Sequence, residues 1–202
     1  MTTTKKTYHH GDLKITLIQA ASDLLHKEGA NALSMRKLAD IVGVSRTAPY
    51  HHFKDKNALL CAIAANGFEQ QTERLRQLIK QQDHSEETFK KYVFLYIHFA
   101  QQQSELYDLM YGRTLWQTGT PNDNLKSASR QAFKCWIDWV EALQKNGVLT
   151  SSNTPLRVGQ ATWASLHGLA RFLIDGIYVD EENVTEMAEQ MLEMMVIKHP
   201  LA

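Results

Sequence analysis

Hydrogen-bond donors and planar side chains are concentrated in one short stretch of the chain, residues 34–56. Arg46, Thr47, Tyr50 and His51 follow one another closely there. Guanidinium, hydroxyl and imidazole groups donate hydrogen bonds to phosphate oxygens and to the base edges in the major groove of DNA. The stretch therefore predicts a surface that contacts nucleic acid.

The chain has none of the spacings of the common catalytic motifs. It contains no H-E-x-x-H, no G-x-S-x-G, no phosphate-binding glycine loop and no C-x-x-C. His51 and His52 are adjacent, and adjacent helical residues point about 100° apart, so the two rings do not share one metal ion well. We expect no catalytic residue, no metal site and no cofactor. A helical enzyme with dispersed catalytic residues, or a pure interaction module, stays open as an alternative.

Two short helices joined by a tight turn are needed to hold the donors on one surface. Ser34 is a natural N-cap of the first helix, because its hydroxyl can accept a hydrogen bond from a free amide of the first turn. Gly43 is expected to end that helix in the left-handed conformation that glycine adopts at little steric cost. Ala39 keeps the corner thin, so the pattern indicates a helix-turn-helix.

The second helix is expected to run from Arg46 to about His52, with Ser45 as its N-cap. It is too short to be stable alone, so its neighbours must hold it and its outer face is available for binding. Pro49 would normally remove a helical hydrogen bond and collide with the carbonyl four residues earlier. Here that carbonyl belongs to Ser45, whose backbone need not be helical, and this makes the proline tolerable.

Apolar residues recur at helical spacing through the rest of the chain, and no segment shows the period of a strand. We expect an all-α fold of about nine helices, with an N-terminal three-helix helix-turn-helix head and a C-terminal helical body. The predicted domains are residues 1–60 and 61–202. Further helices are expected at 13–27, from 55 to 79, from 85 onward, and at 104–111, 122–146, 154–176 and 183–198.

Local signals mark two of the helix starts and two histidines. Thr154 precedes a proline at the first helical position, and Asn183 has Glu186 three residues later, the spacing of a capping box. His98 and His167 each stand alone among apolar neighbours, so we expect both to be hydrogen-bonded core residues.

The segment from Leu33 to Leu60 reads L-S-x-R-x-L-A-x-x-x-G-V-S, then P-Y-H-H-F-K-D-K-x-A-L-L. It resembles the DNA-binding segment of the TetR/AcrR family of bacterial transcriptional regulators. Trp163 with His167 and Gly168 resembles the signature of the family branch whose C-terminal domain is named for Trp-His-Gly. The resemblance implies a homodimer that binds a palindromic operator and is released by a small-molecule effector. Repression is expected from the family, and activation is the alternative.

The resemblance also divides the DNA-contacting residues by role. Base edges are expected to be read by Arg36, Arg46, Thr47 and Ala48. Phosphates are expected to be bound by Ser34, Tyr50, His51 and Lys56, and Ser45 completes the set of DNA-contacting residues.

The net charge of zero hides an asymmetry between the two ends of the chain. Residues 1–60 hold nine Lys and Arg against five Asp and Glu, and the remaining residues hold 13 against 17. A basic head on an acidic body concentrates the attraction for a polyanion at one end.

The body is rich in large aromatic residues. A few polar groups among such side chains can form a ligand pocket, although packing in the core is the commoner role of aromatic residues at helical spacing. The predicted ligand-binding residues are Tyr107, Met110, Trp136, Trp163 and His167, with His167 as the hydrogen-bonding group.

The last two helices carry wide apolar stripes, which could be core or could pair across a twofold axis. A symmetric operator requires a second copy of the helix-turn-helix head. This requirement favours pairing of the last two helices across a twofold axis. The predicted dimerisation residues are Leu166, Phe172, Met187, Met191, Leu192 and Met195.

Cysteine use and hydropathy point to a soluble cytoplasmic protein. Cys61 and Cys135 lie far apart among apolar residues and are expected to be reduced core residues. The chain has no apolar run long enough to span a membrane, and its polar start does not have the pattern of a signal peptide.

Overall fold

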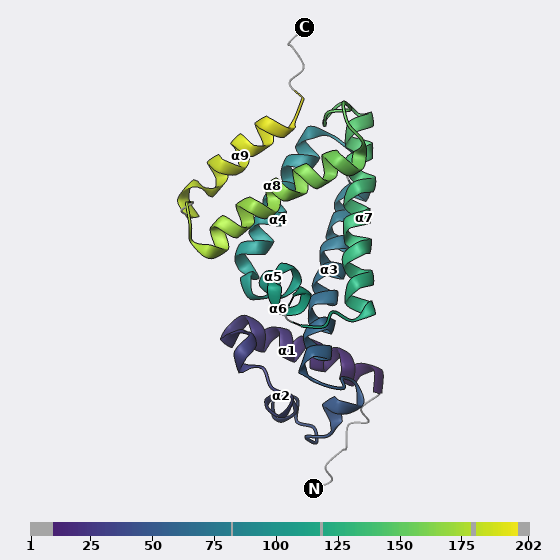
Figure 1. The fold of residues 1–202 in the computed structure, drawn as a ribbon, viewed down its shortest axis with the longest axis vertical. Coiled ribbons are helices and arrows are strands. Elements are labelled where there is room, and N and C mark those ends of the chain that lie inside the picture. Colours follow the sequence, from purple (N-terminus) through teal and green to yellow (C-terminus); the bar gives the residue numbers. More distant parts are fainter. Residues whose placement is uncertain (1–9, 82, 118, 179–180, 198–202) are drawn as a thin grey trace. The chain divides into compact units, whose positions relative to one another are not determined.

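The computed structural model describes residues 10–81, 83–117, 119–178 and 181–197, and helices are the regular elements within them (Figure 1). The described part of the chain contains no strand, only an isolated bridge between Leu149 and Val196. The all-α prediction is confirmed. The helices are α1 (His10–Ala32), α2 (Met35–Val42), α3 (Lys56–Gln81), α4 (Glu86–Gln102), α5 (Ser104–Tyr111), α6 (Arg113–Trp116), α7 (Asp123–Lys145), α8 (Pro155–Asp175) and α9 (Val184–Met195), with short 3-10 helices η1 (Ala48–His51) and η2 (Glu181–Asn183).

The chain forms two compact units. The first unit combines the residues up to 67 with residues 105–126, and the second combines 68–104 with the residues from 127 onward. The first unit therefore includes residues 105–126, which the prediction had placed in the second domain, 61–202.

In the first unit, α1 and α2 pack against each other, and α2 packs against η1. Leu17, Ala21 and Leu25 of α1 are buried, as is Leu38 of α2. Gly29 has a φ of 75° and a ψ of 171°, so the regular part of α1 ends just before it, close to the predicted end at residue 27. The short elements of this unit are thus held by a core that they could not form alone.

In the second unit, α4 packs against α8, and α9 packs against both. The core is rich in aromatic rings: Trp136 stacks on Tyr92 with 5.3 Å between ring centroids, and Trp139 meets the same ring edge-on at 5.2 Å. The Trp136 indole N–H donates to the Gly159 carbonyl at 2.9 Å, which links α7 to α8.

Most predicted helix caps are present. Ser34 and Thr154 each accept a hydrogen bond from the backbone amide three residues later, and Ser85 does the same at the start of α4. Gly43 and Gly176 end α2 and α8 in the left-handed conformation. The helix predicted at 104–111 has these bounds in the structure.

The predictions for the last helix and for His98 were wrong. Asn183 has helical backbone angles because it closes η2, so its side chain makes no cap and the capping box is absent. The helix ends at Met195 and not near Lys198, because Val196 is extended and pairs with Leu149; Lys198 itself lies outside the described residues. His98 is an exposed residue of α4 and not a core residue.

Within the described residues, no helix combines the length and apolar character needed to cross a bilayer.

Candidate nucleic-acid interface

The first helix of the helix-turn-helix, α2, is held at both ends and has two distinct faces. The Ser34 hydroxyl accepts from the Lys37 amide at 3.2 Å, and the Val44 amide donates to the Ala39 carbonyl at 3.0 Å behind the left-handed Gly43. Leu38 and Ala39 are fully buried, whereas Arg36 is exposed. The helix therefore buries its apolar face and leaves the guanidinium in solvent.

The predicted second helix is only a 3-10 turn. The hydrogen bonds from Ala48 N to Ser45 O at 2.9 Å and from Tyr50 N to Thr47 O at 3.1 Å span three residues. Pro49 has no N–H to donate to Ser45, so an α-helical bond cannot form at this point and the chain winds more tightly. The helix predicted from Arg46 to His52 therefore shrinks to η1, and Ser45 does not act as its N-cap, a position taken by Thr47.

Most of the predicted DNA-contacting side chains around η1 are exposed, whereas Ala48 within it is half-buried. Tyr50 has 55% of its surface accessible, and Arg46, Thr47 and His51 are exposed as well, while Pro49 beneath them is buried. A buried proline under a row of exposed donors fixes the backbone of the turn without using the donors.

Arg46 is already oriented by a carboxylate of α2. Its Nε lies 3.7 Å from Oδ1 of Asp40, and both side chains are more than half exposed. Arg36 is four residues before Asp40, so the two lie on the same side of α2. The pair brings Arg46 toward the side of α2 that carries Arg36, although an exposed ion pair of this kind contributes little stability.

Lys56 is less accessible than expected for a phosphate contact. Its ammonium donates to the Ala30 carbonyl at 2.9 Å and is partly buried. A phosphate would have to compete for this donor or share it. Lys54, which was not among the predicted contacts, is exposed, and Lys37 forms a 2.6 Å ion pair with Glu28. Sequence reasoning could have included Lys54 from its position between the turn and α3.

The predicted ligand-binding residues are divided between the two units. Tyr107 and Met110 are fully buried in the first unit. In the second unit Trp136 is buried, and the half-buried rings of Trp163 and His167 stack with 4.9 Å between centroids and 10° between planes. Burial lowers the pKa of His167 below its ordinary value, and the Arg171 guanidinium lowers it further.

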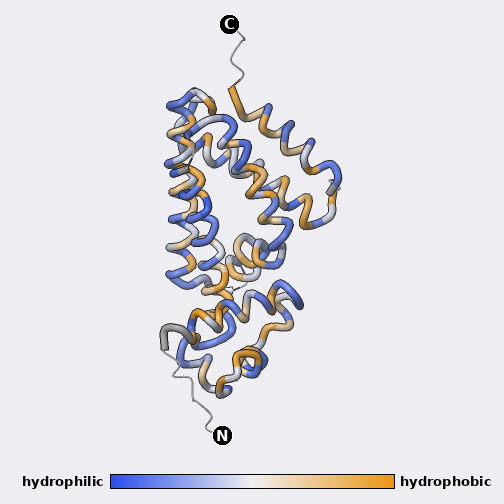
Figure 2. Tube along the Cα trace, turned by 180° about the vertical axis from the view of Figure 1, so that it is seen from behind, coloured by the Kyte–Doolittle hydropathy of each residue, from blue (hydrophilic) through white to orange (hydrophobic). Residues whose placement is uncertain are grey.

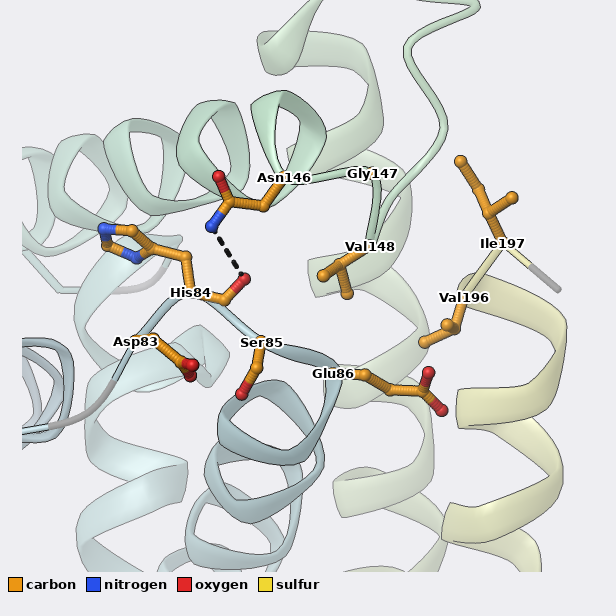
Figure 3. Close-up of a pocket in the computed structure, with 9 residues that line it drawn as sticks. All are labelled: Asp83, His84, Ser85, Glu86, Asn146, Gly147, Val148, Val196 and Ile197. Atoms are coloured by element: carbon orange, nitrogen blue, oxygen red, sulfur yellow. Dashed lines mark hydrogen bonds between the residues drawn. The ribbon is translucent and has the colours of Figure 1, made fainter. Parts of the chain in front are cut away.

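A cavity in the second unit has a different lining, and none of its residues belongs to the predicted ligand-binding set. It is an open, mostly polar cavity of about 480 Å³ (Figure 3). Asn146 donates to the His84 carbonyl at 3.2 Å and so ties the loop after α7 to the loop before α4. The pKa of Asp83 is lowered, first by a hydrogen bond from Ser85. Within the described residues, no group of three or more His, Cys, Asp or Glu is arranged to hold a metal ion.

The predicted dimerisation residues differ in exposure. Leu166 and Leu192 are buried within the second unit, and Met191 and Met195 are half-buried. Phe172 and Met187 have 41% and 42% of their surface exposed. The most exposed apolar residues here, Tyr178 at 90% and Met194 at 88%, were not in the predicted set. Figure 2 shows hydrophobic residues recurring along α8 and α9.

Comparison with protein families gives two matches. A family model described as bacterial regulatory proteins, tetR family, matches residues 17–63. A second model, described as tetracyclin repressor-like, C-terminal domain, matches residues 89–195.

Individual proteins are similar over the head or over the whole fold. The tetracycline repressor protein class A from transposon 1721 of Escherichia coli is 51% identical over 49 residues, and the match covers 24% of this chain and 23% of that protein. The chain thus spans about a quarter of the length of that relative. A protein of unknown function from Rhodococcus sp. RHA1 is 28% identical, with a TM-score of 0.78 over 96% of this chain and 100% of that one. A tetR-family transcriptional regulator from Pectobacterium atrosepticum has the same fold, with 20% identity and a TM-score of 0.71 over 96% and 99% of the two chains.

Proposed function

The chain belongs to the tetR family of bacterial regulatory proteins, and from this premise we propose that it is a repressor that binds a palindromic operator as a homodimer and leaves it when a small molecule binds. As a family member it is a transcriptional regulator with a DNA-binding helix-turn-helix. We also assign it to the branch with the Trp-His-Gly signature, on Trp163, His167 and Gly168.

The observation that carries the proposal is the separation of roles in residues 34–56. The apolar side chains of Leu38, Ala39 and Pro49 are buried, and Arg36 and Arg46 are exposed. Solvent-facing donors on a backbone fixed by caps and a proline are suited to acceptors outside the protein, and the phosphates and base edges of DNA are acceptors of this kind.

Dimerisation is supported by the exposed apolar side chains of the second unit. Phe172 and Tyr178 meet edge-on at 5.6 Å, and Met187 and Met194 of α9 are also exposed. Large exposed apolar side chains on neighbouring helices commonly mark a protein interface. Pairing of α8 and α9 with the same helices of a second copy across a twofold axis would cover these side chains and supply the second helix-turn-helix head.

Release by a small molecule is supported by the residue types in the body. Trp163 and His167 are half-buried, so one ring face or edge is available to a planar compound, and the imidazole can donate or accept a hydrogen bond. Trp136 of the same unit completes the proposed set, and Tyr107 and Met110, which are fully buried in the first unit, are not proposed as part of it. By linkage, a compound that lowers the affinity of the protein for DNA is itself bound more weakly, by the same factor, when DNA is bound.

A gel shift with the DNA that flanks the protein's own gene tests DNA binding. We expect a retarded band that a scrambled duplex does not compete away. Absence of retardation at micromolar protein and low salt would refute the proposal. Deleting the gene distinguishes a repressor from an activator. Expression from the bound promoter should rise if the protein is a repressor and fall if it is an activator.

A thermal-shift screen of small aromatic compounds tests the effector. Compounds that raise the melting temperature and also release the retarded DNA should lose both effects in Trp163→Phe and His167→Gln. Trp116→Phe is the control, because this tryptophan lies in the first unit, where its indole donates to the Met110 carbonyl at 2.7 Å. Equal responses in all variants would show that the proposed effector residues are wrong.

A further inference from the structure

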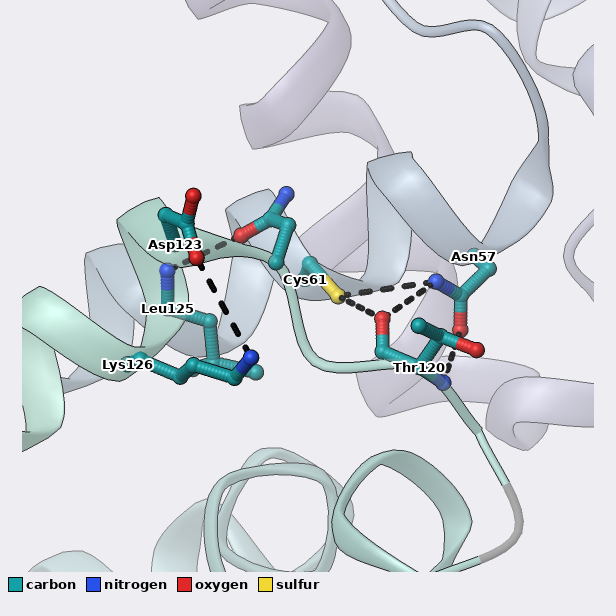
Figure 4. A network of polar contacts seen from close by, with 7 residues as sticks. Asn57, Cys61, Thr120, Asp123, Leu125 and Lys126 are labelled. Carbon is teal, nitrogen blue, oxygen red and sulfur yellow. Dashed lines mark hydrogen bonds and ion pairs between the residues drawn. The ribbon is translucent and has the colours of Figure 1, made fainter.

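The side chain of Asn57 binds the backbone of a residue that is 63 positions further along the chain (Figure 4). Its Nδ2 donates to the Thr120 carbonyl at 2.9 Å, and the Thr120 amide approaches its Oδ1 at 3.5 Å. The Cys61 thiol, one turn later on α3, also lies 3.7 Å from this carbonyl. One amide side chain therefore meets both polar groups of a single residue, which a hydroxyl or a carboxylate cannot do in the same way.

Asn57 stands in the first turn of α3, the helix that follows η1 along the chain. Asp55 accepts from the Ala58 amide at 2.7 Å and caps the helix, and the next residue, Lys56, donates to the Ala30 carbonyl at 2.9 Å. Three consecutive side chains thus fix this turn to itself, to the end of α1 and to Thr120. The Phe53 amide donates to the Pro49 carbonyl at 2.9 Å, so the chain after η1 is hydrogen-bonded up to two residues before Asp55.

The segment that carries Thr120 is itself well held. Leu115 of α6 is fully buried, and Asn122 accepts from the Leu125 amide at 2.9 Å at the start of α7. A Cβ added to Gly119 would lie 2.5 Å from the Thr114 carbonyl oxygen and 3.1 Å from Oδ1 of Asn57. The glycine therefore allows the backbone to lie this close to the Thr114 carbonyl, and a methyl group there would also press on the Asn57 side chain that binds Thr120.

We infer that Asn57 is a positioning residue for DNA binding: its contact with Thr120 completes the reading head with residues 119–120 and holds the first turn of α3 where η1 can read base edges. This inference rests on the proposed DNA-binding function. It assigns a role in DNA recognition to residues outside the segment 17–63 that matches the family's DNA-binding model. The two segments belong to one compact unit, which is consistent with this role.

The bond between Asn57 and Thr120 could mainly stabilise the fold or could position the base-reading groups, and its loss should change DNA binding differently in the two cases. Non-specific binding depends on the number of phosphates neutralised, and specific binding depends also on where the base-reading groups lie. Loss of positioning should therefore lower specific affinity and leave non-specific affinity and its salt dependence nearly unchanged. Loss of stability alone should change the unfolding transition and leave the ratio of specific to non-specific affinity unchanged.

The test uses the full chain with Asn57→Ala, and Asn146→Ala as the matched control. Asn146 makes the same kind of bond in the second unit, to a carbonyl 62 positions away at 3.2 Å. The probes are a duplex that the wild type selects from a random pool and a scrambled duplex of equal length. From the value of one hydrogen bond, we expect Asn57→Ala to weaken binding to the selected duplex about 3- to 10-fold. Asn146→Ala should lower thermal stability only.

Gly119→Ala disturbs the same contact from the other side and provides an independent variant if Asn57→Ala folds poorly. Because both substitutions act through one contact, the double variant should lose no more specific affinity than the worse single variant. Additive losses, or Asn57→Ala binding the selected duplex as tightly as the wild type, would overturn the inference.

Hydrogen exchange of peptides covering residues 46–56 provides a readout that needs no DNA. Exchange there should rise in Asn57→Ala and Gly119→Ala and stay unchanged in Asn146→Ala. If the wild type selects no duplex, the proposed function fails. The exchange data then still decide the inference, because unchanged protection of residues 46–56 in Asn57→Ala would refute it.

Discussion

The two compact units expose different kinds of side chain. In the first unit the exposed residues of the helix-turn-helix include several hydrogen-bond donors, among them Arg36, Arg46 and His51, and one large apolar residue, Ile41. In the second unit the exposed surface of α8, α9 and the segment between them includes large apolar residues. These are Leu156, Phe172, Ile177, Tyr178, Met187 and Met194. One chain of zero net charge thus presents a polar binding surface in one unit and an apolar one in the other.

This difference matches the two kinds of partner proposed above, an operator and a second copy of the chain. A polyanion is bound through donors and cations that remain solvated until contact, whereas a second copy of a chain is bound by burying apolar surface. The units can therefore be tested separately: substitutions in the second should change assembly first, and substitutions in the first should change DNA recognition without changing assembly.

The largest effect is expected from charges on the apolar surface of the second unit. Met187→Glu combined with Met194→Glu should convert the proposed dimer into a monomer, because two carboxylates would be buried without partners. Operator binding should fall by about 10²- to 10⁴-fold, since one head then binds without the second. Sedimentation measures the mass, and a gel shift measures the binding.

Leu95→Glu is the matched control for charge and exposure. Leu95 is 48% exposed on α4 of the same unit, away from α8 and α9 in sequence. It should stay dimeric and bind DNA normally. If the wild type were itself monomeric at micromolar concentration, the apolar surface would need another explanation.

A smaller effect is expected in the first unit from Arg36→Ala. The exposed guanidinium should read a base edge, so its loss should cost ~1–3 kcal/mol at particular base pairs and relax specificity there. Binding to a panel of operator variants measures this. A uniform loss across all variants would instead make Arg36 a phosphate contact.

Lys56→Ala should combine two modest effects. Loss of a phosphate contact should lower the slope of log affinity against log salt by ~1. Loss of the bond to the Ala30 carbonyl should also destabilise the fold by about 1 kcal/mol. Lys54→Ala removes an exposed lysine two residues earlier. It therefore shows the effect of losing a positive charge while the bond from Lys56 to the Ala30 carbonyl is kept. If Lys56→Ala lowers only stability, its ammonium belongs to the fold and not to DNA.

The features that were predicted correctly from the sequence depend on neighbouring residues. Ser34 and Thr154 cap their helices through an amide three residues away, and Gly43 ends α2 because the chain must turn there. Such rules need only a few consecutive residues, so a single sequence contains the required information.

The wrong predictions share a different cause. Pro49 turned an expected helix into a 3-10 turn, and Asn183 is helical because it is the last residue of η2. In both cases a neighbouring constraint outweighed a residue preference. The contact between Asn57 and Thr120 could not be predicted at all, because no periodicity or motif connects residues that far apart. Long-range polar contacts depend on packing, which the pattern of one sequence does not specify.

The smallest predicted effect concerns pH and the second unit alone. Partial burial, and then Arg171 one turn later, lowers the pKa of His167, so the folded protein favours the neutral ring. The unfolded chain takes up the proton more readily, and stability should therefore fall as the pH drops through the ordinary histidine pKa of about 6.5 toward the lower folded value. His167→Gln removes this contribution, so its melting temperature should fall less than that of the wild type between pH 8 and pH 5. Arg171→Gln removes the second cause and should give an intermediate slope. Parallel curves for all three proteins would mean that the stacked ring on Trp163 titrates equally in the folded and unfolded states, and the second unit would then sense neither charge nor pH at this position.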